Sequence, residues 1–103
     1  MTGLMEDNAI VTLTTTVKRN ETKFLANALG EEMVMMNMEN GDFISMNRVG
    51  ADIWNLSQTP VSVAELVQKL LNLYDISEEQ CLNEVIEFLQ ASTTQHMFLL
   101  VNA

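Results

Sequence analysis

The sequence predicts an α+β domain of the winged helix-turn-helix type, with a three-stranded antiparallel sheet followed by three α-helices. Apolar, β-prone runs fill residues 24–46 and are separated by glycine-containing turns, which is typical of antiparallel strands. Two segments of the form Ser-x-x-Glu/Gln, at Ser62 and Ser77, each precede an apolar run with helical spacing. Strands that come before helices along a chain favour the α+β class.

The size and composition of the chain indicate one small domain. It has 103 residues, of which 48% are hydrophobic. Residues 1–12 lack periodicity and are interpreted as a flexible arm, with a short strand at residues 10–13 as an option, and residues 13–103 form the domain. No apolar run approaches the roughly 20 residues of a membrane span. A signal-peptide pattern is absent, and the single cysteine suits a reducing compartment. A cytoplasmic protein without a membrane partner is therefore predicted.

Three strands are predicted at residues 24–29, 33–38 and 43–46. The first turn is expected at residues 30–31. The pair Asn40-Gly41 predicts a type I′ hairpin, because both residues tolerate a positive φ. Alternation along the third strand then places Ile44 and Met46 on one face of the sheet and Phe43 and Ser45 on the other.

Three helices follow at residues 48–57, 62–74 and 77–91, with capping boxes at the starts of the second and third. Asn47 ends the third strand and is a suitable N-cap for the first helix. The third helix carries a broad apolar arc, which Cys81 and Phe88 widen. Either this helix is simply well buried, or its extra edge lines an exposed groove. The apolar tail Met97–Val101 would promote aggregation if uncovered, so it is expected to complete the core or form a short wing strand.

The charge of the chain argues against a nucleic-acid partner. It has 14 acidic and five basic residues, for a net charge of −9. A nucleic-acid binder needs Lys and Arg to displace counterions from phosphate, whereas this chain would repel a duplex. Such a charge favours solubility or a basic partner.

No catalytic or metal-binding pattern is present. His96 is the only histidine, and a lone histidine near a helix end is more often a solvated or capping residue than a base. Cys81 lies in the first turn of a helix, where the helix dipole lowers a thiol pKa, but neighbouring glutamates favour the neutral thiol. A packed structural cysteine is therefore expected. Phosphate-binding glycine loops and calcium loops are also absent, so the sequence predicts a protein that is not an enzyme and holds no cofactor or metal.

Several short motifs follow one another in a characteristic order between about residue 22 and residue 100. They are Asn40-Gly41, Phe43, Met46-Asn47, Gly50, Ile53-Trp54, the Val61–Glu65 cap, Tyr74, the acidic cap Ser77–Gln80, and Phe88-Leu89. In this order and spacing they resemble the PqqD-like family, also called the precursor-peptide recognition element of ribosomally synthesised and modified peptides (RiPPs). Met46 stands where the family more often has Leu, and the tail lacks the family's usual Gly before its apolar end.

The resemblance implies a non-catalytic module that binds the leader of a precursor peptide. The family presents that leader to a maturation enzyme, such as a radical-SAM protein, a cyclase or a leader peptidase. The leader adds as an antiparallel strand to the third strand and lies against the third helix.

The residues themselves agree with this mode of binding. The third strand comes last in the expected sheet order, so one of its edges should be unpaired and open to strand addition. The predicted peptide-binding residues are Asp42, Phe43, Ile44, Ser45 and Met46 on the strand and Cys81, Glu84, Val85 and Phe88 on the helix. Glu84 would pair with a basic leader residue. Alternatively, Phe43 is an ordinary surface aromatic and Glu84 an ordinary solvated acid.

Two other functions fit the same elements. A winged-helix nucleic-acid binder has the same elements, but the net negative charge of the chain argues against this function. A structural or oligomer-forming protein would use the same open edge to pair with a second copy of the chain, as a homodimer.

Overall fold

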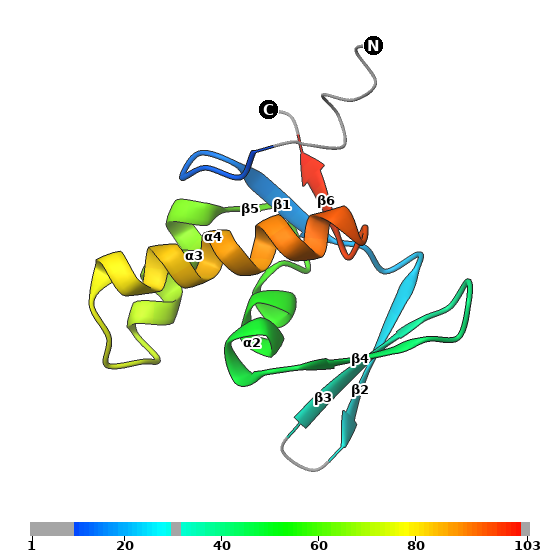
Figure 1. Ribbon diagram of the computed structural model, residues 1–103. Helices are drawn as coiled ribbons and strands as arrows, with labels where there is room; N and C mark the ends of the chain where they lie inside the picture. Colours follow the sequence, from blue (N-terminus) through cyan, green and yellow to red (C-terminus); the bar gives the residue numbers. More distant parts are fainter. Residues whose placement is uncertain (1–9, 30–31, 102–103) are drawn as a thin grey trace.

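The computed structural model describes residues 10–29 and 32–101, and it has an α+β fold compatible with a winged helix-turn-helix (Figure 1). The strands and helices, in chain order, are β1 Thr16–Arg19, β2 Phe24–Leu29, β3 Glu32–Asn37, β4 Phe43–Met46, α2 Arg48–Leu56, β5 Val61–Ser62, α3 Val63–Leu71, α4 Glu78–Thr94 and β6 Phe98–Val101. The predicted strand–strand–strand–helix series from residue 24 to residue 57 is confirmed. The turn predicted at residues 30–31 lies outside the described residues.

The strands form two separate three-stranded antiparallel sheets rather than one. The hairpin sheet has the order β2-β3-β4, and the second sheet has the order β5-β1-β6. The second sheet was not predicted, except that the apolar tail forms the short strand β6. In it, β1 lies between β5 and β6, so that a strand near the start of the chain pairs with the last one. The optional strand at residues 10–13 is wrong, because the first strand of the described residues begins at Thr16. Within the predicted arm, Val11 is buried.

The turn between β3 and β4 is a correction to the sequence prediction. A type I′ turn requires a positive φ at both central residues, but only Gly41 has one, at 78°. Asn37 N–H donates to the Asp42 carbonyl over 2.8 Å, and Gly41 N–H donates to the Asn37 carbonyl over 2.7 Å. The hairpin therefore closes over four residues, with Gly41 supplying the left-handed conformation at the end of the loop.

Side-chain caps start all three helices at the predicted residues. The Asn47 side chain accepts from Gly50 N–H over 2.7 Å, and Ser62 with Glu65 forms a complete capping box. Ser77 also caps its helix, but Gln80 does not complete a box, because its amide donates to Glu84. Helix α3 ends at Leu71 rather than Tyr74, and α4 continues to Thr94 rather than ending near Ala91.

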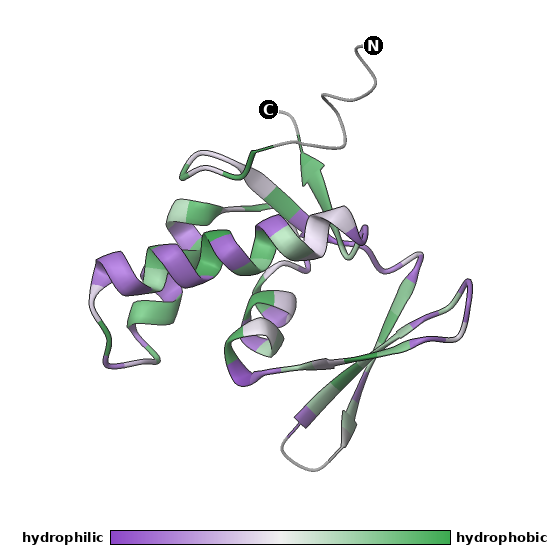
Figure 2. Cartoon of the chain, viewed as in Figure 1, coloured by the Kyte–Doolittle hydropathy of each residue, from purple (hydrophilic) through white to green (hydrophobic). Residues whose placement is uncertain are grey.

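One continuous core joins the helices to both sheets. Figure 2 shows hydrophilic and hydrophobic residues alternating along α4, as expected for a helix with one face in the core. Its buried side chains meet α3, while Val17 of β1 and Met35 of β3 are fully buried in the two sheets. The Trp54 and Phe98 rings pack edge to face, with centroids 5.7 Å apart, and link α2 to β6. Figure 1 shows the hairpin sheet projecting from this helical body.

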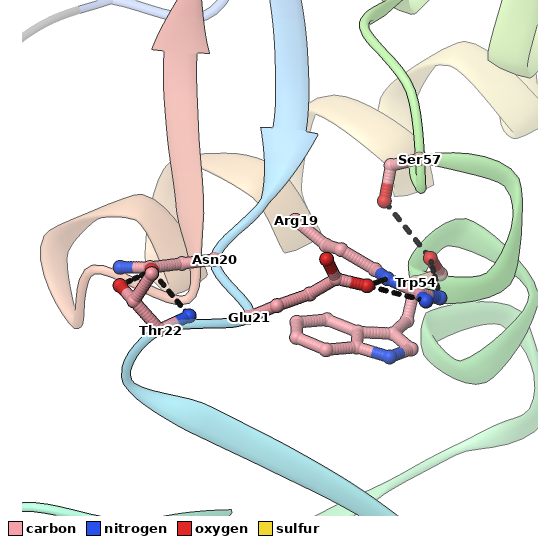
Figure 3. A network of polar contacts seen from close by, with 6 residues as sticks. All are labelled: Arg19, Asn20, Glu21, Thr22, Trp54 and Ser57. Carbon is pink, nitrogen blue, oxygen red and sulfur yellow. Dashed lines mark hydrogen bonds and ion pairs between the residues drawn. The ribbon is translucent and has the colours of Figure 1, made fainter.

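A polar junction fixes the chain where it passes from β1 to the hairpin sheet (Figure 3). Arg19 forms an ion pair with Glu21 over 2.6 Å, and its guanidinium carbon lies 5.3 Å from the centre of the Trp54 ring. The buried Asn20 side chain donates to the His96 carbonyl over 2.8 Å and accepts from the Thr22 hydroxyl. These contacts join the end of β1 to α2 and to the turn before β6, so they set the direction in which the hairpin sheet leaves the body.

Candidate functional site

Strand β4 has one unpaired edge among the residues that the structure describes. It pairs with β3 in antiparallel register, with Ile44 opposite Met35 and Met46 opposite Met33. The hydrogen bond from Asn37 to the Asp42 carbonyl marks Asp42 as turned toward β3. Because backbone groups alternate in direction along an antiparallel strand, the N–H and C=O groups of Phe43 and Ser45 turn toward the open edge. This edge offers donors and acceptors to an additional strand.

A cleft of about 220 Å³ lies between β4 and the C-terminal half of α4. Its apolar walls are formed by Ile44 and Met46 on the strand and by Phe88, Ala91 and Met97 on the other side. The polar residues Ser45, Asn47, Ser92 and Gln95 complete the lining. The cleft therefore joins an open strand edge to an apolar helix face.

Phe88 is the main aromatic group of this cleft, and several contacts fix it. Its ring packs edge to face on Phe98, with centroids 5.8 Å apart. Its carbonyl accepts a hydrogen bond from the Ser92 hydroxyl over 2.7 Å. A Cβ atom on Gly50 would lie only 2.9 Å from the Phe88 ring and 3.1 Å from the Asn47 side-chain oxygen. The glycine thus lets α2 approach both the ring and its own N-cap.

Two further hollows continue the cleft along β4. One, of about 500 Å³, lies at the Asp42 end and shares Ile44 and Gln95 with the cleft. The other, of about 660 Å³, lies at the opposite end, between Glu32 and Arg48. Each of these two hollows shares lining residues with the cleft, and we call the three hollows together the β4 groove.

The outer face of the hairpin sheet is also apolar. Leu25, Val34, Met36 and Phe43 line a hollow of about 430 Å³ on this face. Phe43 is 70% exposed and borders both this hollow and the Asp42 end of the groove. Its exposure is therefore part of a larger apolar face of the sheet.

The structure brings together six of the nine predicted site residues. Residues 42–46 form β4 and its approach, and Phe88 lies across the cleft from Ile44 and Met46. Cys81 and Val85 are only 2% and 0% exposed, so they lie in the core behind the groove. Glu84 is half-buried, accepts from Gln80 and does not line the cleft.

The residues that sequence reasoning missed lie one and two helical turns beyond Phe88. Ala91, Ser92 and Gln95 follow Phe88 at the i+3, i+4 and i+7 spacing of one helix face. That spacing can be read from the sequence. The helix was predicted to end near Ala91, however, so Ser92 and Gln95 fell outside it. Met97 completes the wall from the turn after the helix.

Two titratable groups near the core, Cys81 and Tyr74, have raised pKa values that reflect their packing and hydrogen bonding. Burial raises the pKa of the Cys81 thiol, and the charges of Glu84 and Glu78 raise it further, in agreement with the expected packed thiol. The Tyr74 hydroxyl donates to Asp52, which joins the loop after α3 to α2. Burial, this hydrogen bond and the Asp52 charge raise the pKa of Tyr74 to about 12, although Arg48 opposes the shift.

The described residues contain neither a metal-binding cluster nor a membrane-spanning helix. Across residues 10–29 and 32–101, no group of three or more His, Cys, Asp or Glu side chains could hold a metal ion. None of the described helices combines the length and the apolar character needed to cross a membrane.

The fold and the β4 groove define a small α+β protein with an open sheet edge beside an apolar helix. The family model described as Coenzyme PQQ synthesis protein D (PqqD) matches residues 32–97, and the chain belongs to this family. A comparison with curated proteins gives no match. The fold is similar to the solved structure of TbiB1 in complex with the TbiA(beta) leader peptide, with a TM-score of 0.69 and 18% sequence identity. The match covers 79% of this chain and 93% of that chain.

Proposed function

We propose that this protein is a non-catalytic module that binds the leader segment of a ribosomally synthesised precursor peptide and presents it to a modifying enzyme. The leader adds as an antiparallel strand to the open edge of β4 and lies in the β4 groove. Membership of the PqqD family supports a role in the maturation of such peptides. The similar fold of TbiB1, which was solved with a leader peptide, supports the same role.

The observation that carries the proposal is the open edge of β4 beside an apolar cleft. A guest strand would bond to the backbone groups of Phe43 and Ser45, which supply affinity that depends little on sequence. Its alternate side chains would enter the cleft between Ile44 and Phe88, where apolar contacts provide selectivity. An affinity near the micromolar range is expected for a groove of this size.

A proline substitution tests strand addition directly. Ser45→Pro removes an N–H that points to the open edge, and it leaves the ladder to β3 intact because Ser45 does not bond to that strand. We expect this variant to keep its fold and to bind the leader at least about tenfold more weakly, the effect of losing one main-chain hydrogen bond and distorting its neighbours. The probe is a leader peptide, the N-terminal segment of a short precursor peptide, and binding is measured by calorimetry.

Ala28→Pro is the matched control. The Lys23 carbonyl bonds to Met38 N–H of the turn that follows β3, so the even-numbered residues of β2 turn toward the outer edge of that strand. Ala28→Pro therefore places a proline on the opposite edge of the same sheet, and leader binding should not change. Equal affinity of wild type and Ser45→Pro, or unshifted amide signals of residues 43–46 in an NMR titration with the leader, would exclude strand addition to β4.

A further inference from the structure

The Asp42 end of the β4 groove carries negative charge that nothing in the described structure neutralises. The hollow there is lined by Asp42 and by the amides of Asn37, Asn40 and Gln95, beside Phe24, Phe43 and Ile44. No Lys or Arg is among these residues. Within the described residues, the Asp42 carboxylate has no ion-pair partner, although Lys23 pairs nearby with Glu39 over 3.6 Å.

Helix α4 adds to this negative potential. Its C-cap, Gln95, lies in the wall of the hollow, and the last turn of the helix contains no basic residue. The C-terminus of a helix of 17 residues carries about half a negative charge from its aligned peptide dipoles, although hydrogen bonds to its last carbonyl groups reduce this charge. A carboxylate and a helix C-terminus therefore border the same space, and a cation placed there would interact favourably with both.

The register of a guest strand fixes where its side chains lie. Asp42, Ile44 and Met46 alternate onto the face of the strand that lines the groove. A guest residue opposite Ile44 would enter the apolar cleft, and a residue opposite Asp42 would enter the negative hollow. In an antiparallel guest, the residue opposite Asp42 comes two positions after the residue opposite Ile44.

From this register and charge we infer that the β4 groove selects peptides with the pattern apolar-x-Arg/Lys, the basic residue lying on the C-terminal side and pairing with Asp42. This inference rests on the proposed function and adds the chemistry of the ligand. Asp42 acts as a specificity-determining residue. An arginine suits the hollow well, because its planar fork can bond to the carboxylate and to amide oxygens together. The net charge of −9 favours the approach of such a peptide.

The test uses the full chain and a displayed library of random peptides of about eight residues, a typical strand length. Wild type should enrich apolar-x-Arg/Lys. Asp42→Lys should enrich apolar-x-Asp/Glu instead, and should bind a selected apolar-x-Arg peptide about tenfold more weakly than wild type, because attraction becomes repulsion. Asp42→Asn should lose the charge preference. Asp75→Lys makes the same change of charge in the exposed loop between α3 and α4 and should leave the selection unchanged.

The outcomes separate the inference from the proposed function. One outcome is that the enriched peptides shift the amide signals of residues 43–46 while Asp42→Lys still enriches peptides with a basic residue. That result would overturn the charge selectivity alone. Enrichment of the reversed order, basic-x-apolar, would overturn the antiparallel register. If wild type enriches no peptide, or the enriched peptides leave residues 43–46 unshifted, both the inference and the proposed function are wrong.

Discussion

At the scale of single residues, the Tyr74–Asp52 hydrogen bond gives the protein a testable response to alkaline pH. The folded pKa of Tyr74 is about 12, above the value near 10 of an unfolded tyrosine. A raised pKa stabilises the folded state below about pH 10, and this contribution is lost as the pH rises through 12, because the unfolded chain releases its proton first.

We therefore expect the Tyr74 contribution to the free energy of unfolding to be lost between about pH 10 and pH 12, so that stability falls less over this range in Tyr74→Phe than in wild type. Tyr74 is the only tyrosine, so the near-ultraviolet absorbance of its phenolate follows its titration directly. A folded-state midpoint near 10 in that titration, the same as in denaturant, would contradict the proposed environment of Tyr74.

His96 occupies a position that favours glycine. Its φ is 64°, in the left-handed region. The N–H groups of His96 and Met97 donate to the carbonyls of Thr93 and Ser92, the two bonds of a Schellman motif.

Replacing His96 with Gly should raise the free energy of unfolding by about 0.5–1 kcal/mol, since glycine adopts this conformation without a Cβ clash. Urea denaturation measures the change. Gln95→Gly, one residue earlier at a φ of −95°, is the control and should destabilise the protein instead. Equal effects of the two substitutions would show that the left-handed position has no special cost.

At the scale of the elements, the close approach of α2 and α4 couples the shape of the cleft to one glycine. In Gly50→Ala, the gain of about 1 kcal/mol in helix propensity is opposed by an overpacking cost of about 1–3 kcal/mol against Phe88. The two terms nearly cancel if the ring moves, and the ring can only move at the expense of the cleft wall.

We expect Gly50→Ala to change the free energy of unfolding by no more than about 1–2 kcal/mol, while leader affinity falls several-fold because Phe88 is displaced. Calorimetry and urea denaturation separate the two effects. Asn55→Ala, exposed on the same helix, gains propensity without touching the ring and should leave affinity unchanged. A Gly50→Ala variant that is more stable and binds normally would contradict this coupling.

The elements differ in how far the sequence could predict them. The helix starts at Asn47, Ser62 and Ser77 were predicted because a cap depends on residues only a few positions apart. The hairpin was predicted, but its turn type was not, since the preference of Asn-Gly for type I′ yielded to a four-residue loop that keeps Asn37 paired with Asp42.

Strands β1 and β5 were missed because their structure depends on distant partners. β1 reads Thr-Val-Lys-Arg, with a single apolar residue, and β5 has only two residues. Thr16 pairs with Ser62 and Val101, which are 46 and 85 positions away. A local sequence pattern cannot predict pairing between residues so far apart. For the site, the open edge of β4 followed from strand order, whereas the burial of Cys81 and Val85 depends on how α4 is rotated about its axis.

At the scale of the whole molecule, Phe98 joins the second sheet to the groove. Its ring packs on both Trp54 and Phe88, so it connects β6 with α2 and α4. The aromatic wall of the cleft is thus supported from behind by a residue near the end of the chain.

Phe98→Ala should lower the free energy of unfolding by about 3–5 kcal/mol, the usual cost of removing a buried phenylalanine, out of a total of about 5–15 kcal/mol. Leu99→Ala, at an exposed neighbouring position, should change it by less than about 0.5 kcal/mol. Chemical denaturation followed by Trp54 fluorescence provides the measurement. A loss below about 1 kcal/mol for Phe98→Ala would mean that the tail is not part of the cooperative core.

The second sheet also decides where the chain can be joined to other proteins. Thr16 and Val101 are partners in its ladder, so the start of β1 and the end of β6 lie side by side, away from the hairpin sheet (Figure 1). A tether that continues from the end of β6 would therefore start on the far side of the molecule from β4. We expect immobilisation through a tether that follows β6 to leave the β4 groove accessible.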